Sequence, residues 1–288
     1  MPIRNIDFCF WNECNNHCLM CSNPNDSWRL AKYDYNNLVS RLKDIKGKVG
    51  SITVTGGEPT INPDFTRVFD FMKNKLPEAR VSLLTNGRRF YYADFTKKCC
   101  ELKHLSFVIT LHGYNEHTHD EITLVKGSFR QTCRGLDNIL KFKKPGQALE
   151  IRVVITKINL SFYTKILSFI KENYPGADRI VLLFLEIEGA AQENINQVGL
   201  TYSKLGKSLP GLSSIIPAFR EFRLYHFPLC VINKSFWKYV WATLPEQEII
   251  FPSGCKKCIY KTSCPGVHKG YIENYGDREF RAFLKRVG

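Results

Sequence analysis

Short apolar runs alternate six times with longer amphipathic or polar segments between about residue 5 and residue 185. The runs are rich in β-branched and aromatic residues and are apolar on both faces, as the strands of a buried parallel sheet are. Repeated strand and helix pairs of this kind are typical of an α/β fold. The predicted strands span residues 6–10, 51–55, 81–85, 106–111, 150–155 and 180–185, and the predicted helices span residues 35–45, 64–76, 93–102, 131–142 and 161–173.

Six strand–helix units are too few for a closed eight-stranded barrel, so we predict an open, partial (β/α)6 TIM barrel. The remaining third of the chain has a different pattern. Residues 189–211 are polar and contain glycine, and residues 212–223 look helical with a break at Pro217. The strings PLC, WKYVW and EIIF then indicate a hairpin. We therefore expect a barrel domain over residues 1–210 and a small hairpin-and-loop domain over residues 211–288.

Three cysteines follow the first predicted strand within eight residues, in the string CNNHCLMC. They are Cys14, Cys18 and Cys21. Three thiolates on one short loop can hold three corners of an iron–sulfur cube and leave the fourth iron without a protein ligand. A zinc site built from the same cysteines is the alternative, but zinc needs a fourth ligand, and His17 beside Cys18 is poorly placed to supply it.

A tight turn, Gly56, Gly57, Glu58 and Pro59, follows the second predicted strand. Two glycines allow the backbone to approach a ligand closely. The CxxxCxxC loop together with the GGEP turn resembles the radical S-adenosylmethionine superfamily, and the likeness extends over the six-unit barrel. The resemblance implies that the three cysteines hold a 4Fe-4S cluster whose open iron is chelated by S-adenosylmethionine. It also implies that the turn holds the methionine ammonium through backbone carbonyls and Glu58.

Further contacts to S-adenosylmethionine are expected where other strands end. Met20 precedes the third cysteine, where the family usually has an aromatic residue, and a flexible thioether can fill the same apolar space. The resemblance suggests that side chains near other strand ends bind the ribose and the carboxylate. These candidates are Asn86, Thr110, His112 and Arg152.

A second group of cysteines lies near the C-terminus, where Cys255, Cys258 and Cys264 have metal-type spacing and Cys230 precedes them. Four thiolates from one small unit can close a metal site. The arrangement resembles the shorter, single-cluster form of the auxiliary extensions (SPASM/twitch-like) of radical S-adenosylmethionine enzymes, which implies a second 4Fe-4S cluster. A structural zinc site is the alternative for these residues.

The chain carries 41 basic and 27 acidic residues, a net charge of +14, which favours an acidic partner. A nucleic acid is not favoured, because no basic low-complexity arm accompanies this charge. Thiolate ligands need a reducing compartment. The first residues do not resemble a signal peptide, and no apolar run is long enough to suggest a membrane span, so we expect a cytoplasmic protein.

The resemblance implies an enzyme that cleaves S-adenosylmethionine reductively to a 5′-deoxyadenosyl radical, which abstracts hydrogen from a substrate. Enzymes with auxiliary extensions commonly modify ribosomally made peptides, so we expect crosslinking, oxidation or epimerisation of a peptide side chain. The resemblance also implies an electron donor such as flavodoxin or ferredoxin. Radical modification of a nucleotide, a nucleoside or another small molecule is the alternative, and a zinc-dependent nucleic-acid-binding protein is the alternative of another class.

Overall fold

The computed structural model describes residues 4–23, 31–45, 49–206 and 209–286. By its internal contacts the chain divides into two compact units. The first unit comprises residues 1–17, 25–151 and 174–178, and the second comprises residues 18–24, 152–173 and 179–288. The division therefore passes through the cysteine loop, between His17 and Cys18.

The first unit contains four parallel strands in sequence order. Phe8 pairs with Val54, Val54 with Leu83, and Leu83 with Phe107, so equivalent apolar residues lie side by side across the strands. The strands are β1 (Arg4–Trp11), β2 (Val49–Gly56), β3 (Arg80–Thr85) and β4 (Leu105–Thr110). All four of these paired side chains are buried, and they share one face of the sheet. Burial on both faces is seen in β4, where the successive residues Phe107, Val108 and Ile109 are buried, but not in β3, where buried and less buried residues alternate.

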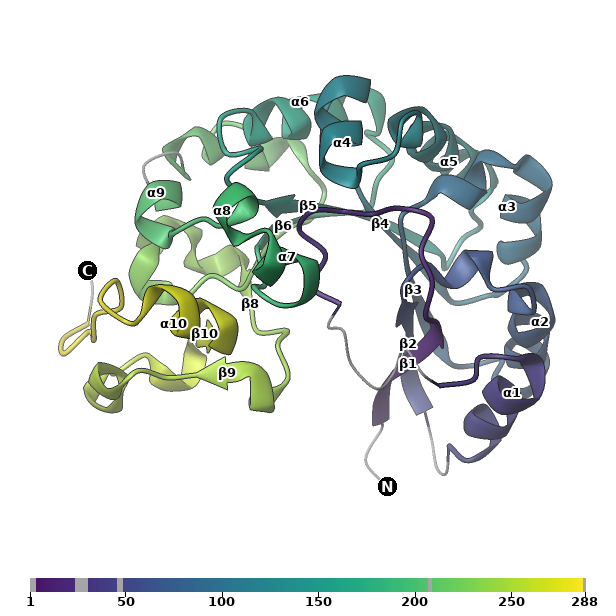
Figure 1. The fold of residues 1–288 in the computed structure, drawn as a ribbon, viewed down its shortest axis with the longest axis horizontal. Coiled ribbons are helices and arrows are strands. Elements are labelled where there is room, and N and C mark those ends of the chain that lie inside the picture. The colour runs from purple at the N-terminus through teal and green to yellow at the C-terminus, as the bar shows by residue number, and fades with distance from the viewer. Residues whose placement is uncertain (1–3, 24–30, 46–48, 207–208, 287–288) are drawn as a thin grey trace. The chain divides into compact units, whose positions relative to one another are not determined.

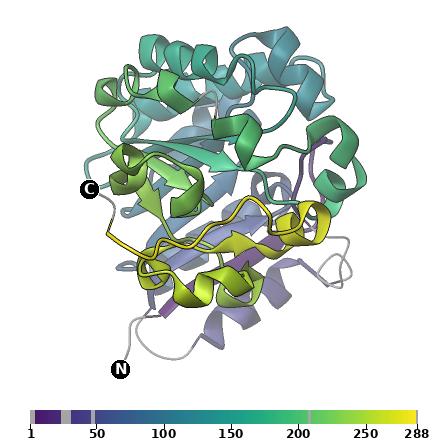
Figure 2. The ribbon, with the colours of Figure 1, turned by 90° about the vertical axis from the view of Figure 1, so that its left-hand side faces the viewer.

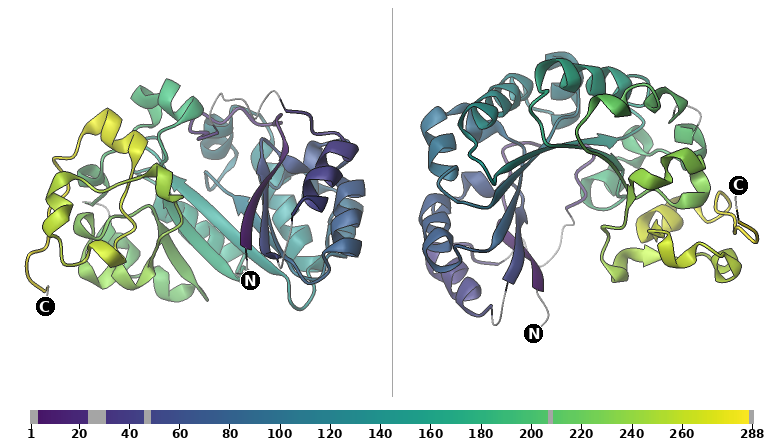
Figure 3. Two further views of the ribbon diagram at one scale, coloured as in Figure 1. Left: turned by 90° about the horizontal axis from the view of Figure 1, so that it is seen from below. Right: turned by 180° about the vertical axis from the view of Figure 1, so that it is seen from behind.

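The helices of the first unit begin at residues that can cap them. Asp34 accepts a hydrogen bond from the backbone of Asn37 at the start of α1, and Asn115 forms a capping box with Thr118 at the start of α4. These helices are α1 (Tyr35–Lys43), α2 (Phe65–Lys75), α3 (Ala93–Cys99), α4 (Glu116–Thr123) and α5 (Ser128–Phe142). Helices α1, α2 and α3 cover one face of strands β1 to β3 (Figures 1 and 3).

The second unit contains strands β6 (Arg179–Phe184), β7 (Phe222–Tyr225) and β8 (Val240–Trp241), which are parallel. A separate antiparallel pair, β9 (Ile249–Ile250) and β10 (Val267–His268), leads directly into the last helix (Figure 2). The helices are α6 (Tyr163–Asn173), α7 (Gly189–Glu193), α8 (Ile195–Val198), α9 (Tyr202–Gly206) and α10 (Lys269–Tyr275).

Eight strands follow one another in the order β1 to β8, and the division between the units falls within β5 (Ala148–Ile155). The α/β class and the open, partial barrel are confirmed, and all six predicted strands are present. Strands β7 and β8 extend the sheet beyond the predicted six. The boundary between residues 210 and 211 stays a prediction. None of the helices in the described ranges is both long enough and apolar enough to cross a membrane.

Two predictions for the last third of the chain are wrong. Residues 212–223 do not form a helix, because Pro210 and Pro217 cannot donate backbone hydrogen bonds, and two short 3-10 turns, Leu209–Leu212 and Ile216–Ala218, precede β7 instead. The strings WKYVW and EIIF do not pair as a hairpin. The first contributes β8, which pairs in parallel with β7, and the second contributes β9, which pairs with β10.

Candidate functional site

The glycine turn after β2 lies directly against the backbone at the start of the cysteine loop. The Gly57 amide donates to the Trp11 carbonyl over 2.8 Å, and the Glu58 amide donates to the Glu13 carbonyl over 2.7 Å. A Cβ atom on Gly57 would lie 2.2 Å from the Glu13 carbonyl oxygen, and one on Gly56 would lie 2.2 Å from that of Trp11. Only glycine permits this approach, so the turn holds the residues that precede Cys14.

The Glu58 carboxylate is almost completely buried, with 1% of the residue exposed. It accepts hydrogen bonds from the Thr60 amide and hydroxyl, from the Thr85 hydroxyl over 2.7 Å, and from the Asn86 amide over 2.7 Å. Burial raises the pKa of Glu58, and the four donors oppose that shift. Glu58 therefore joins the ends of β2 and β3, and direct contact with S-adenosylmethionine stays a prediction.

Two polar donors lie near the Cys14 sulfur, one from the residue after β3 and one from the cysteine loop itself. The Asn86 side-chain amide donates to Asn15 Oδ1 over 2.7 Å and lies 3.8 Å from Cys14 Sγ. The Asn16 backbone amide lies 3.3 Å from the same sulfur. Hydrogen bonds to sulfur stabilise thiolates and tune iron–sulfur clusters. This donor set fits Cys14 as a cluster ligand.

Arg88 and Thr85 are residues of this site that the sequence analysis did not identify. The Arg88 guanidinium donates to Asn16 Oδ1 over 2.8 Å and also contacts the Asn15 carbonyl, so it holds the middle of the cysteine loop. Thr85 is the last residue of β3. Both residues stand within two positions of Asn86, at the end of β3. Functional side chains of α/β barrels are expected at strand ends, so Thr85 and Arg88 could have been identified in the same way as Asn86.

The other predicted contacts in the first unit lie at the ends of their strands. Pro59 begins a 3-10 turn after β2, and Thr110 is the last residue of β4. His112 is buried, and its backbone amide donates to Nδ1 of the buried His119 over 3.2 Å. Burial lowers the pKa of both imidazoles, that of His119 to about 4, so both are neutral near pH 7.

This histidine pair predicts how stability depends on pH. Below the ordinary histidine pKa the unfolded chain binds protons that the folded chain excludes, so stability falls as the pH is lowered through about 6.5. For His119 alone the loss amounts to about 2 kcal/mol at about pH 5. Melting curves at about pH 7.5 and about pH 5 should show a smaller acid loss for His119→Gln than for the wild type. An equal loss in both proteins would contradict this assignment.

The second half of the cysteine loop belongs to the second unit. Cys18 and Cys21 are half-buried, and the Cys21 amide donates to the Cys18 carbonyl over 3.2 Å. Met20 is buried. Arg152 lies within β5, and its guanidinium carbon is 5.5 Å from the centre of the Tyr225 ring. Cofactor contacts through Met20 and Arg152 stay predictions.

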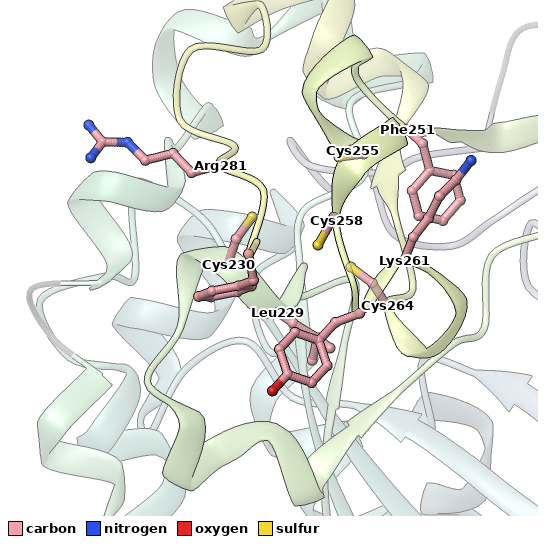
Figure 4. A pocket seen from close by; sticks show the side chains of 10 residues that line it. Leu229, Cys230, Phe251, Cys255, Cys258, Lys261, Cys264 and Arg281 are labelled. Atoms are coloured by element: carbon pink, nitrogen blue, oxygen red, sulfur yellow. The ribbon is translucent and has the colours of Figure 1, made fainter. Parts of the chain in front are cut away.

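The four C-terminal cysteines line one small pocket together with apolar side chains such as Leu229, Phe251 and Phe283. Figure 4 shows the sulfur atoms of Cys230, Cys258 and Cys264 facing the same space. Burial raises the pKa of Cys230 to about 11 and that of Cys264, although backbone amides donate to both sulfurs. Thiols in such a setting ionise when a metal binds them, which fits a metal site.

Within the described ranges, no three His, Cys, Asp or Glu side chains are close enough to hold one metal ion together. Zinc draws its sulfur ligands to about 2.3 Å from a single centre. An iron–sulfur cube separates its thiolates more widely, because each thiolate binds a different iron. A single-ion arrangement is therefore not seen at either cysteine group in this part of the chain, and the second cluster stays a prediction.

Comparison with protein families identifies the barrel. Residues 8–169, more than half of the chain, match the Radical SAM superfamily. The chain belongs to the radical SAM superfamily. The matched range contains the cysteine loop, the glycine turn and strands β2 to β5.

The curated proteins that are similar to this chain are named for several different activities. The chain is 28% identical over 145 residues to the mycofactocin maturase MftC of Mycobacterium tuberculosis, a match that covers 50% of this chain and 35% of that protein. It is 28% identical over 185 residues to the AdoMet-dependent heme synthase of Methanosarcina barkeri, a match that covers 63% of this chain and 50% of that protein. It is 26% identical over 161 residues to a probable GTP 3′,8-cyclase of Saccharolobus islandicus, a match that covers 55% of this chain and 47% of that protein. The matched parts span a third to a half of these relatives.

Solved structures show the same fold. SuiB of Streptococcus suis bound to its precursor peptide SuiA gives a TM-score of 0.58 at 15% identity and covers 76% of this chain and 48% of SuiB. The protein anSMEcpe with bound AdoMet gives a TM-score of 0.56 at 18% identity, covering 77% of this chain and 64% of anSMEcpe. At such low identity these likenesses concern the fold alone.

Proposed function

We propose that this chain is a radical SAM enzyme whose Cys14, Cys18 and Cys21 hold a 4Fe-4S cluster that binds S-adenosylmethionine. The observation that carries the proposal is the donor set around Cys14, where the amides of Asn16 and Asn86 face the sulfur. When bound, the cluster supplies the electron that cleaves S-adenosylmethionine to a 5′-deoxyadenosyl radical. A cytoplasmic location follows from the reduced state that thiolate ligands need.

The chain's own residues prepare this site. Gly56 and Gly57 allow the turn to hold the loop backbone, and Glu58 fixes the amide of Asn86. Asn86 in turn orients Asn15 and faces Cys14. Because these groups are hydrogen-bonded to one another, contacts within the protein position the first part of the loop.

We also propose a second 4Fe-4S cluster on Cys230, Cys255, Cys258 and Cys264. The apolar pocket and the backbone amides that donate to Cys230 and Cys264 support it, since buried, hydrogen-bonded thiolates are what such clusters use. The electron for the first cluster would come from a flavodoxin or ferredoxin. If zinc occupied this site instead, the site would contribute no visible absorption.

For the substrate we propose a ribosomally made peptide that undergoes crosslinking, oxidation or epimerisation. Support comes from three proteins similar to this chain: SuiB is seen with its precursor peptide, anSMEcpe with peptides, and MftC is named a maturase. A nucleotide or another small molecule is the second candidate, since a probable GTP 3′,8-cyclase and a heme synthase are also similar to this chain.

The test begins with anaerobic reconstitution with iron and sulfide, followed by reduction and addition of S-adenosylmethionine. We expect broad visible absorption from the clusters and formation of 5′-deoxyadenosine. Deuterium-labelled peptides and deuterium-labelled GTP then distinguish the substrate classes, because the true substrate transfers deuterium to 5′-deoxyadenosine. A colourless protein that binds only zinc and forms no 5′-deoxyadenosine would refute the enzyme proposal.

A further inference from the structure

The second half of the cysteine loop, residues 18–23, rests on the segment that follows β6. The Ser22 hydroxyl donates to Glu186 Oε2 over 2.8 Å, and the Ala191 amide donates to the Cys21 carbonyl over 3.1 Å. The Asn194 side-chain amide donates to the Leu19 carbonyl over 3.3 Å. All these residues belong to the second unit. We call residues 186–194 the loop seat.

Gly189 is the closest point of contact in the loop seat. Its φ angle is +52°, a conformation that residues with side chains rarely adopt. A Cβ atom there would lie 2.2 Å from the Asn23 carbonyl oxygen and 3.1 Å from the Cys21 carbonyl oxygen. A side chain at position 189 would therefore push the backbone of Cys21 to Asn23 away from the seat.

Glu186 is itself held from its other side. Its Oε1 lies 3.4 Å from Nδ1 of His226, which is 5% exposed. Burial lowers the pKa of His226, so the imidazole is neutral near pH 7. Both the Phe184 carbonyl and Glu186 face Nδ1, and because both are acceptors this nitrogen carries the proton. Glu186 thus bridges the end of β7 and the residue next to Cys21.

We propose that the loop seat positions Cys21, so that retention of the first cluster depends on Gly189, Glu186 and Ala191. The inference rests on the proposed function in that Cys21 is taken as a ligand. Groups that orient metal ligands typically change metal retention about 10- to 100-fold. The loop seat would have this effect without touching the metal, because it contacts the backbone of Cys21 and its neighbours.

The test compares Gly189→Ala with Gly276→Ala in the 288-residue chain. Gly276 has a φ of +71° and a ψ of −165°, a conformation essentially confined to glycine. Apart from its chain neighbours, no atom of the described residues lies within 4 Å of the position that its Cβ would take, so its replacement strains the backbone without such a contact. After reconstitution, we expect Gly189→Ala to lose the iron of the first site to a ferrous chelator about 10- to 100-fold faster than the wild type. Gly276→Ala should match the wild type.

A second readout needs no metal. In the apoprotein of Gly189→Ala, the backbone amides of residues 18–23 and 186–194 should exchange their hydrogens faster than in the wild type. The melting temperature of the variant shows whether it folds. Ser22→Ala removes only one hydrogen bond and should release iron about 10-fold faster. Iron release from Gly189→Ala and Ser22→Ala at the wild-type rate would overturn the inference, as would unchanged exchange in the apoprotein. A wild-type protein that forms no cluster on the three cysteines would instead refute the proposed function, and the exchange data would still decide whether the seat exists.

Discussion

Replacement of Cys14, Cys18 and Cys21 by Ala is expected to abolish cleavage of S-adenosylmethionine and to leave roughly half of the iron on the protein. The cleavage is lost because the iron that would bind the cofactor is no longer held. The remaining iron is that of the C-terminal site, if each site holds one four-iron cluster. Iron analysis, visible absorption and the yield of 5′-deoxyadenosine measure the outcome.

The matched control replaces Cys255, Cys258 and Cys264 by Ala. This variant should also lose roughly half of the iron, but it should still form 5′-deoxyadenosine. Complete iron loss in the first variant would contradict a separate C-terminal cluster. Normal cleavage in the first variant would contradict the assignment of the three cysteines.

The second large effect is expected for Glu58→Gln. A glutamine has one acceptor oxygen where the carboxylate has two. Its NH2 group would face the Asn86 amide if it replaced Oε2, or the Thr60 and Thr85 donors if it replaced Oε1. The orientation that keeps the amide oxygen on the Thr60 and Thr85 donors leaves one buried donor, the Asn86 amide, without an acceptor. One such donor costs about 1 to 3 kcal/mol, so the free energy of unfolding should fall by about 1 to 3 kcal/mol. Because Asn86 faces Cys14, affinity for S-adenosylmethionine should fall as well.

Urea or thermal unfolding and equilibrium binding of S-adenosylmethionine to the reconstituted protein measure both effects. Glu78→Gln is the control, since that side chain is 80% exposed. Its replacement should change the free energy of unfolding by less than about 0.5 kcal/mol. An equally small change in Glu58→Gln would show that the buried network does not stabilise the end of β3.

The predictions from sequence succeeded where local pattern and burial agree. The predicted strand at residues 81–85 lies within β3, and Val81 and Leu83 are buried on one of its faces. The predictions failed where a short segment depends on a distant partner. Val240 and Trp241 form a strand only because β7 lies beside them, and Ile249 and Ile250 only because β10 does.

The sequence by itself determined the α/β class, the six strands and the cysteine and glycine motifs, because these depend on residue type and spacing along the chain. Only the tertiary structure decided which groups hold the motifs. Glu58 accepts its hydrogen bonds from Thr85 and Asn86 at the end of another strand, and Cys21 rests on a segment about 170 residues away along the chain. Contacts of this kind arise from the register of parallel strands and from close backbone approach. Neither can be predicted from the spacing of residues along the chain.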